Sequence, residues 1–236
     1  RKSLYWGGLL MIAGSLILAI DPIRFFFFGI SFTIVGTGFF KPNISTMVGT
    51  LYHEGDPRRD AGFSLFYAGI NLGALIGGYL CVAVGKGEML SSIVPAHLTW
   101  NVAFGFAAVV MIISLLTFMF TQKSMGEIGV SPLLHLPQVK RRNIEILTYV
   151  GSLLIIPLIM TMVAKTAYTD LFMYIIGPAT LIYLAYEMRG FSVSERKKLL
   201  AALVFIFFSI IFWAFFEQSG GSLSLFAEKN LDKNLV

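Results

Sequence analysis

Long apolar stretches separated by short polar clusters make up most of the chain. A helix needs about 20 predominantly apolar residues to cross a bilayer. Seven segments reach or approach that length, at residues 4–20, 23–51, 61–84, 98–120, 144–164, 171–187 and from 199 to beyond 216. This pattern predicts an all-α fold, a polytopic bundle of transmembrane helices.

Basic residues gather on one predicted side of the membrane. If Arg1 and Lys2 face the cytoplasm, alternation of the seven segments places the basic clusters within 58–59, 123–142 and 189–198 on that same side. Single basic residues alone fall on the opposite side. An excess of Lys and Arg in cytoplasmic loops is the pattern that orients membrane proteins. The charge pattern therefore supports both the helix count and the orientation.

Composition agrees with a membrane protein: 56% of residues are hydrophobic, 13% are charged, and the mean hydropathy is +0.78. The net charge of +5 forms no basic, aromatic-interleaved patch, so the sequence predicts no nucleic-acid partner. His53, His97 and His135 lack metal-ligand spacing, and no cofactor or metal is predicted. Cys81 is the one cysteine, so no intrachain disulfide is expected.

Residues 121–143 are polar and contain prolines, so they are predicted to form a cytoplasmic linker rather than a span. The linker separates residues 1–120 from an apolar helix pair at 144–188, which we expect to be a lipid-facing scaffold, followed by 189–236. The chain starts with Arg1 and not with Met, which suggests a piece of a longer chain. A cleaved signal peptide at this end is the alternative.

Two charged side chains fall well inside apolar segments, Lys41 and Glu217. A charge at the bilayer centre costs about 2.5–3.5 kcal/mol on insertion scales, and such residues usually mark functional sites. Lys41 lies roughly 15 Å along a helix from the next polar loop, which is far for snorkelling. We therefore predict a functional lysine. The alternative is an ion pair that only locks two helices together.

The stretch around Lys41 reads GTGFFKPNIS. Pro42 has no backbone N–H and clashes with the preceding turn, so the sequence predicts an interrupted helix here. Gly36 and Gly38 add two positions without side chains. A hinge formed by Gly36, Gly38 and Pro42 is one interpretation, and simple close helix packing is the other.

The third segment contains FYAGINLGAL. Gly69, Gly73 and Gly77 recur every four residues, a spacing that favours tight helix contact. Tyr67 and Asn71 are also four residues apart and so share a different face of the same helix. An asparagine amide inside a membrane needs a partner, which either a ligand or a neighbouring helix would provide.

The last segment reads FWAFFEQSGGSLSLFA. Trp213 and Glu217 are four residues apart and share one helical face. A glutamate in an apolar site either takes up a proton or pairs with a cation such as Lys41, and a switch between these states would couple transport to protons. An acid at the outer membrane edge is the alternative. We favour a helix that continues to about Glu228 and keeps Glu217 inside the membrane.

In this order, the motifs GTGFFKPNIS, FYAGINLGAL and FWAFFEQSGGSLSLFA resemble those of the proton-dependent oligopeptide transporter family of the major facilitator superfamily. The resemblance covers essentially the whole chain, and the inserted helix pair is similar to prokaryotic members. It implies that 1–120 are the later helices of the N-terminal bundle, from helix three to helix six. It also implies that 144–188 is an inserted pair and 189–236 the first helix of the C-terminal bundle.

The resemblance further implies roles for matched residues. Lys41 would bind the carboxylate of a peptide, and Asn71 would hydrogen-bond its amino terminus. Trp213 and Tyr67 would line the pocket. Glu217 would be a proton-linked acid that exchanges partners, with Lys41 also contributing to proton coupling.

The function implied is proton-coupled symport of di- and tripeptides by alternating access, in a prokaryotic inner membrane. Protons would be the coupling ion, and the partners would be membrane lipid and the remaining helices of the transporter. The ExxERF motif of the family is absent from this chain, which fits a partial chain.

Two alternatives stay open. One is a transporter of another small zwitterion or anion on the same fold. The other is a structural membrane subunit in which Lys41 and Glu217 merely pair. An intramembrane enzyme is not expected, because the apolar segments show no nucleophile–base pair or histidine cluster.

Overall fold

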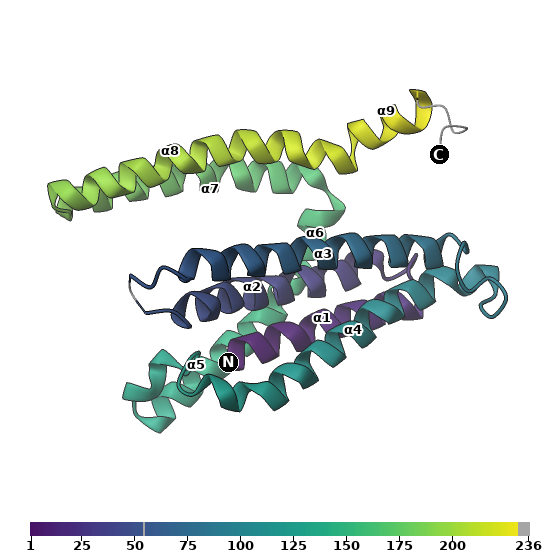
Figure 1. Cartoon of the computed structure of the whole chain (residues 1–236), viewed down its shortest axis with the longest axis horizontal. Helices are drawn as coiled ribbons and strands as arrows, with labels where there is room; N and C mark the ends of the chain where they lie inside the picture. The colour runs from purple at the N-terminus through teal and green to yellow at the C-terminus, as the bar shows by residue number, and fades with distance from the viewer. Residues whose placement is uncertain (54, 231–236) are drawn as a thin grey trace. The chain divides into compact units, whose positions relative to one another are not determined.

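The computed structural model describes residues 1–53 and 55–230. Within these ranges the chain is helical and contains no strand, which confirms the all-α prediction (Figure 1). The α-helices in chain order are α1 (Lys2–Ile20), α2 (Phe26–Thr50), α3 (Arg59–Gly85), α4 (Thr99–Thr121), α5 (Gln138–Leu154), α6 (Ile156–Ala164), α7 (Thr166–Glu187), α8 (Val193–Phe216) and α9 (Ser222–Asn230).

Six helical stretches of the described chain are long and apolar enough to cross a membrane. They correspond to six of the seven predicted segments. The remaining helix, α2, has 25 residues and therefore sufficient length. It falls outside the six because Lys41, Pro42 and Asn43 make its sequence less apolar.

Pro42 does not interrupt its helix, contrary to the sequence-based expectation. Helix α2 runs from Phe26 to Thr50 with Pro42 inside it. Prolines are tolerated in membrane helices where hydroxyl side chains and neighbouring helices compensate for the lost hydrogen bond. The carbonyl that loses its helical donor at Pro42 is that of Gly38. In the turn that follows, Ser45 Oγ donates to the Lys41 carbonyl at 3.0 Å and Thr46 Oγ1 to the Pro42 carbonyl at 2.9 Å, which adds hydrogen bonds to the continuing helix.

The last apolar segment is not one continuous helix to about Glu228, contrary to the sequence-based expectation. Helix α8 ends at Phe216, a 3₁₀ turn covers Glu217–Gly220, and α9 starts at Ser222. Gly221 has φ −120° and ψ −104°, outside the helical region. The consecutive glycines Gly220 and Gly221 lower the free-energy cost of this break, because glycine is less stable in a helix than other residues are and adopts non-helical backbone angles readily.

The inserted segment also differs from its predicted bounds. Helix α5 begins at Gln138, inside the stretch predicted to be linker. The helical path changes at Ile155, and Pro157 occupies the first turn of α6, where its missing N–H costs nothing.

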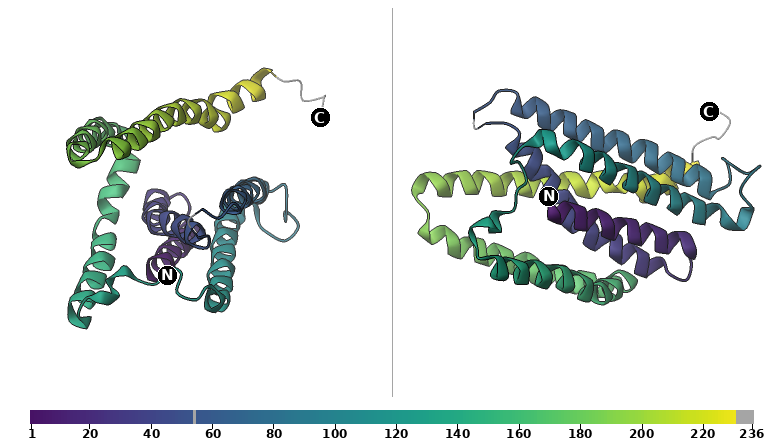
Figure 2. Two further views of the ribbon diagram at one scale, coloured as in Figure 1. Left: turned by 60° about the vertical axis from the view of Figure 1, so that its left-hand side comes forward. Right: turned by 90° about the horizontal axis from the view of Figure 1, so that it is seen from below.

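The chain divides into two units, Arg1–Asp170 and Leu171–Val236, with α7 crossing the division. In the first unit α1 packs against both α2 and α4, α3 packs on α4, and α6 packs on α2 (Figures 1 and 2). The second unit contains most of α7, together with α8 and α9. No described residue of α7 or α8 is buried within the chain, so lipid or other protein must cover these apolar helices in a membrane.

Glycines allow the closest approach in the first unit. A Cβ atom placed on Gly14 of α1 would lie 2.6 Å from the carbonyl oxygen of Gly29 on α2, and 2.6 Å from Thr33 Oγ1. Backbone contact of this kind increases van der Waals packing, which is what holds membrane helices together. Nearby, Leu4 and Met47 form a buried cluster with Leu115 of α4.

The ends of α1 and α4 are joined by an amide. Asn101 Nδ2 donates to the carbonyl oxygens of Ala19 at 2.8 Å and Ile20 at 3.0 Å. These carbonyls belong to the last turn of α1, where helical donors are lacking. The contact therefore fixes the register between α1 and α4.

Candidate functional site

Lys41 lies on the exposed side of α2, and no ion pair found within residues 1–53 and 55–230 includes it. Its neighbour Asn43 instead donates to the Phe39 carbonyl at 2.7 Å, so that amide is used within the helix. The ammonium of Lys41 is thus available to a ligand. The Lys41–Glu217 pair considered above is not among the ion pairs of the described chain, and the two residues belong to different units.

The two glycines predicted as hinge positions have different surroundings. Gly36 is buried, and its Cα faces the backbone of α1. A Cβ atom on Gly38 would meet nothing within 4 Å. Gly36 therefore has a packing role in this structure, while the hinge formed with Gly38 and Pro42 stays a prediction.

Tyr67 and Asn71 lie on an exposed face of α3, and Tyr67 is 60% exposed. The Asn71 side chain makes no hydrogen bond to another described residue. The glycine ridge predicted to form a tight contact is also open, since a Cβ atom on Gly69, Gly73 or Gly77 would meet nothing within 4 Å. Within the described chain, the tight glycine contact occurs between α1 and α2 instead.

Trp213 and Glu217 share a shallow groove along α8 with a volume of about 580 Å³. The predicted spacing therefore places both on one face, although Glu217 begins the 3₁₀ turn at the end of the helix. The Trp213 ring packs edge-on against Phe216, with ring centroids 5.2 Å apart. Because Trp213 remains 48% exposed, it offers an aromatic surface beside an acid.

The structure thus brings Trp213 and Glu217 together in the second unit, and it places Tyr67 and Asn71 one helical turn apart in the first. Among the residues described, no hydrogen bond or ion pair joins Lys41 to Tyr67 or Asn71. The candidate residues Lys41, Tyr67 and Asn71 therefore belong to the first unit, and Trp213 and Glu217 to the second.

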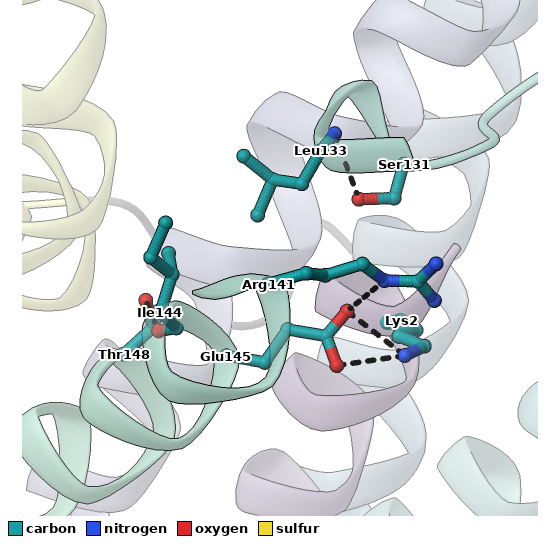
Figure 3. A network of polar contacts seen from close by, with 7 residues as sticks. All are labelled: Lys2, Ser131, Leu133, Arg141, Ile144, Glu145 and Thr148. Carbon is teal, nitrogen blue, oxygen red and sulfur yellow. Dashed lines mark hydrogen bonds and ion pairs between the residues drawn. The ribbon is translucent and has the colours of Figure 1, made fainter. Parts of the chain in front are cut away.

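The sequence interpretation missed a polar network between α1 and α5 (Figure 3). Glu145 of α5 accepts from Lys2 Nζ at 2.8 and 2.9 Å, and from Arg141 Nε at 3.2 Å. The i,i+4 spacing of Arg141 and Glu145 was the one available sequence signal. Its link to Lys2 joins positions 143 residues apart and has no local signature.

One turn further along, α1 and α5 are joined by an indole. Trp6 Nε1 donates to Ser152 Oγ at 2.9 Å, and the Trp6 and Tyr149 rings lie 4.9 Å apart. Ser152 is buried. One face of α5 therefore packs on the bundle, so this part of the inserted pair does not face lipid all round.

In the described part of the chain, no group of three or more His, Cys, Asp or Glu residues could hold a metal ion. The chemistry available at the candidate site is instead that of a free ammonium, an amide, two aromatic rings and a carboxyl group.

Comparison with known proteins gives one consistent result. The family model PTR2, described as "POT family", matches residues 1–235. The peptide transporter YePEPT of Yersinia enterocolitica is 30% identical over 100% of this chain and 47% of its own length. A di-/tripeptide transporter of Lactococcus lactis is 31% identical over 98% of the chain and 47% of its own length.

A solved structure shows the same fold. The crystal structure of peptide transporter POT in complex with sulfate matches with a TM-score of 0.67 and 30% identity, over 98% of this chain and 47% of that one. The chain thus spans about half the length of the curated relatives it matches. With six membrane-length helices and bacterial relatives, it is an integral protein of the bacterial inner membrane.

Proposed function

The chain belongs to the POT family, and on that premise we propose that it forms part of a proton-coupled symporter of di- and tripeptides that works by alternating access. In this proposal residues 1–120 supply helices three to six of the N-terminal bundle. Residues 144–188 are the inserted pair, joined by the cytoplasmic linker 121–143, and 189–236 begin the C-terminal bundle. Two curated relatives are named as a peptide transporter and a di-/tripeptide transporter, which supports this substrate class.

The observation that carries the proposal is the exposed ammonium of Lys41 inside α2, which forms no ion pair with the residues that the structure describes. A lysine in a membrane helix is costly unless it faces water, a partner or a ligand. A peptide carboxylate is a suitable partner, because a charge-assisted hydrogen bond is about twice as strong as a neutral one.

Asn71 and Tyr67 would complete the first half of the peptide site. The Asn71 amide oxygen would accept a hydrogen bond from the ammonium of the peptide, and Tyr67 would contact its side chains. In the second unit Trp213 would form an aromatic wall. Glu217 beside it would carry the proton and pair with a basic group, Lys41 included, in one state of the cycle.

Uptake measurements in proteoliposomes of the complete transporter test this function. An inward proton gradient should drive accumulation of radiolabelled dialanine, and unlabelled dipeptides should compete. The peptide assignment would be wrong if dialanine neither accumulates nor competes. If another small zwitterion or anion accumulates instead, the alternative substrate class is correct.

A purely structural subunit makes a different prediction. If Lys41 and Glu217 only pair, exchanging both charges, as Lys41→Glu with Glu217→Lys, should leave function intact. A transporter that uses them for substrate and proton should lose coupled uptake in the double variant. Surface expression and the thermal midpoint of the double variant serve as the control for folding.

A further inference from the structure

A second polar site lies at the start of α5, within the first unit, and Lys41 does not line it. It is a concave pocket of about 490 Å³. Its lining combines basic, acidic and apolar side chains from α1, the linker and α5: Lys2, Leu134, Leu136, Arg141, Arg142 and Glu145. We refer to these six residues as the rim pocket.

The rim pocket carries more positive charge than its acid neutralises. Glu145 accepts from Lys2 and from Arg141, so a single carboxylate faces three basic groups. Arg141 uses only its Nε in this contact, and its two terminal nitrogens point away from Glu145 (Figure 3). Arg142 is exposed and enters no ion pair within the described chain. The pocket therefore presents guanidinium donors to an incoming anion.

Apolar side chains continue from the pocket along the outside of α5. Leu134 at the pocket is 55% exposed. On α5 itself Ile146 is 46% exposed and Leu153 41% exposed. They follow Arg142 by four and eleven residues and so lie on its side of the helix. In a spanning helix these apolar side chains face acyl chains, which puts the basic first turn of α5 at headgroup level on the predicted cytoplasmic side.

We propose that the rim pocket binds the phosphate of an anionic phospholipid. Basic pockets at the cytoplasmic ends of membrane helices suit anionic headgroups, and the guanidinium fork matches phosphate oxygens in pairs. Glu145 orients Lys2 and Arg141 around the pocket. The inserted helix pair thereby gains a role beyond peptide transport, as a lipid contact on the transporter.

The apolar side chains beside the pocket favour a phospholipid over soluble phosphate, because only a phospholipid has acyl chains to cover them. Soluble phosphate would satisfy the basic groups and leave Leu134, Ile146 and Leu153 uncovered. A phospholipid satisfies both parts at once, since its acyl chains lie along the same helix that supplies the guanidinium groups. Phosphatidylglycerol is a suitable probe, with phosphatidylcholine as the neutral comparison.

Lipid retention measured by native mass spectrometry of the purified protein tests the proposal. The protein should retain phosphatidylglycerol more strongly than phosphatidylcholine. Arg142→Gln should weaken retention of phosphatidylglycerol about fivefold, since a basic residue near an anionic lipid contributes about that factor. Arg142→Lys should restore most of it. The proposal would be overturned if Arg142→Gln retained phosphatidylglycerol as strongly as the unchanged protein. It would also be overturned if the unchanged protein showed no preference for phosphatidylglycerol over phosphatidylcholine.

Two controls make the result specific. Lys198→Gln removes an equally exposed basic residue from α8, in the other unit, and should leave retention unchanged. An equal loss in Lys198→Gln would mean nonspecific attraction and would overturn the site. Glycerophosphoglycerol carries the same phosphodiester without tails. If it displaces phosphatidylglycerol at matched concentration, the ligand is a soluble phosphate and the lipid assignment fails.

Discussion

Gly7 of α1 and Gly36 of α2 face each other with no room for a side chain on either. A Cβ atom on Gly7 would lie 2.6 Å from the Gly36 carbonyl oxygen, and one on Gly36 would lie 2.6 Å from the Gly7 carbonyl oxygen. The contact is reciprocal and involves backbone, which cannot move aside. Gly36, considered above as a hinge residue, is therefore also where α1 and α2 touch.

Gly36→Ala should destabilise the protein by roughly 1–3 kcal/mol, the usual cost of overpacking a tight contact. The readout is the thermal unfolding midpoint of the purified protein in detergent. Gly38→Ala is the matched control, because its position is open, and it should leave the midpoint nearly unchanged or raise it. Similar losses in both variants would contradict the packing role of Gly36.

Trp6 and Ser152 should be energetically coupled. Replacing Trp6 by Phe removes the indole N–H that donates to the buried Ser152 hydroxyl. A double-mutant cycle with Ser152→Ala should give a coupling of about 0.6 kcal/mol, the typical value for hydrogen bonds between membrane helices. Thr161→Ala serves as the control, because the Thr161 hydroxyl donates to the Leu158 carbonyl within its own helix. A cycle with Trp6→Phe and Thr161→Ala should show no coupling energy. An equal coupling energy in both cycles would mean that Trp6 and Ser152 are not specifically coupled.

Lys41→Ala should weaken binding of dialanine roughly 10- to 100-fold, because hydrogen bonds to charged groups contribute about 1.5–3 kcal/mol. The measurement is a competition binding assay on the complete transporter. A dipeptide with an amidated carboxyl terminus is the matched ligand, and its weaker binding should change little in the variant. Unchanged affinity for dialanine would remove Lys41 from the peptide site.

Glu217→Gln should abolish accumulation driven by a proton gradient and largely spare counterflow exchange, which needs no gradient. Glutamine keeps the shape of glutamate in the groove beside Trp213 but cannot take up or release the proton. Gln218→Ala, at the neighbouring position, is the control and should keep both activities. Equal loss of accumulation and counterflow in Glu217→Gln would mean that Glu217 binds substrate or holds the fold, and does not couple protons.

The loop between α2 and α3 provides a pH test outside the membrane. Arg58 donates to both oxygens of Asp56, at 3.1 and 2.9 Å, and lowers the pKa of that carboxyl group from 3.8 to about 2. A lowered pKa means that the interaction stabilises the loop above pH 3.8 and is lost as pH falls through about 2. Titration of the Asp56 carboxyl carbon by NMR should show the low value.

In that titration, Arg58→Gln should return the pKa of Asp56 towards its ordinary value. Arg59→Gln is the control, because the Arg59 guanidinium lies over the Phe63 ring at 6.0 Å. A normal pKa in the unchanged protein would show that the Asp56–Arg58 contact is not held in solution.

Much of the helix plan was predictable from hydrophobic patterning, since apolar runs and charged loops directly reflect the bilayer. The predicted end of the first segment coincides with that of α1 at Ile20, and the third and fourth segments match α3 and α4 within two residues at each end. The break after Phe216 was not predicted, because SGGSLSLFA is apolar enough to continue a span. Deciding that case depends on the conformation of Gly221, which hydropathy does not encode.

The candidate site was predictable only as residue types on helical faces. Spacing placed Trp213 with Glu217 correctly, because i,i+4 neighbours follow from helix geometry. Spacing says nothing about which helices touch. The glycines of α3 and those of α1 and α2 look alike in sequence, yet a partner is present for Gly7 and Gly36 and absent within 4 Å for Gly69. Contact between distant segments, such as Lys2 with Glu145, depends on the assembled fold.

The glycine contact between α1 and α2 also has a consequence for biogenesis. The two helices follow each other directly, connected by a short turn in which Asp21 Oδ1 accepts from the Ile23 and Arg24 amides at 3.1 and 2.9 Å. Once both helices have left the translocon, they can pair without waiting for any later part of the chain. Membrane helices insert first and associate afterwards, so this hairpin would be an early template on which α4 and α6 assemble.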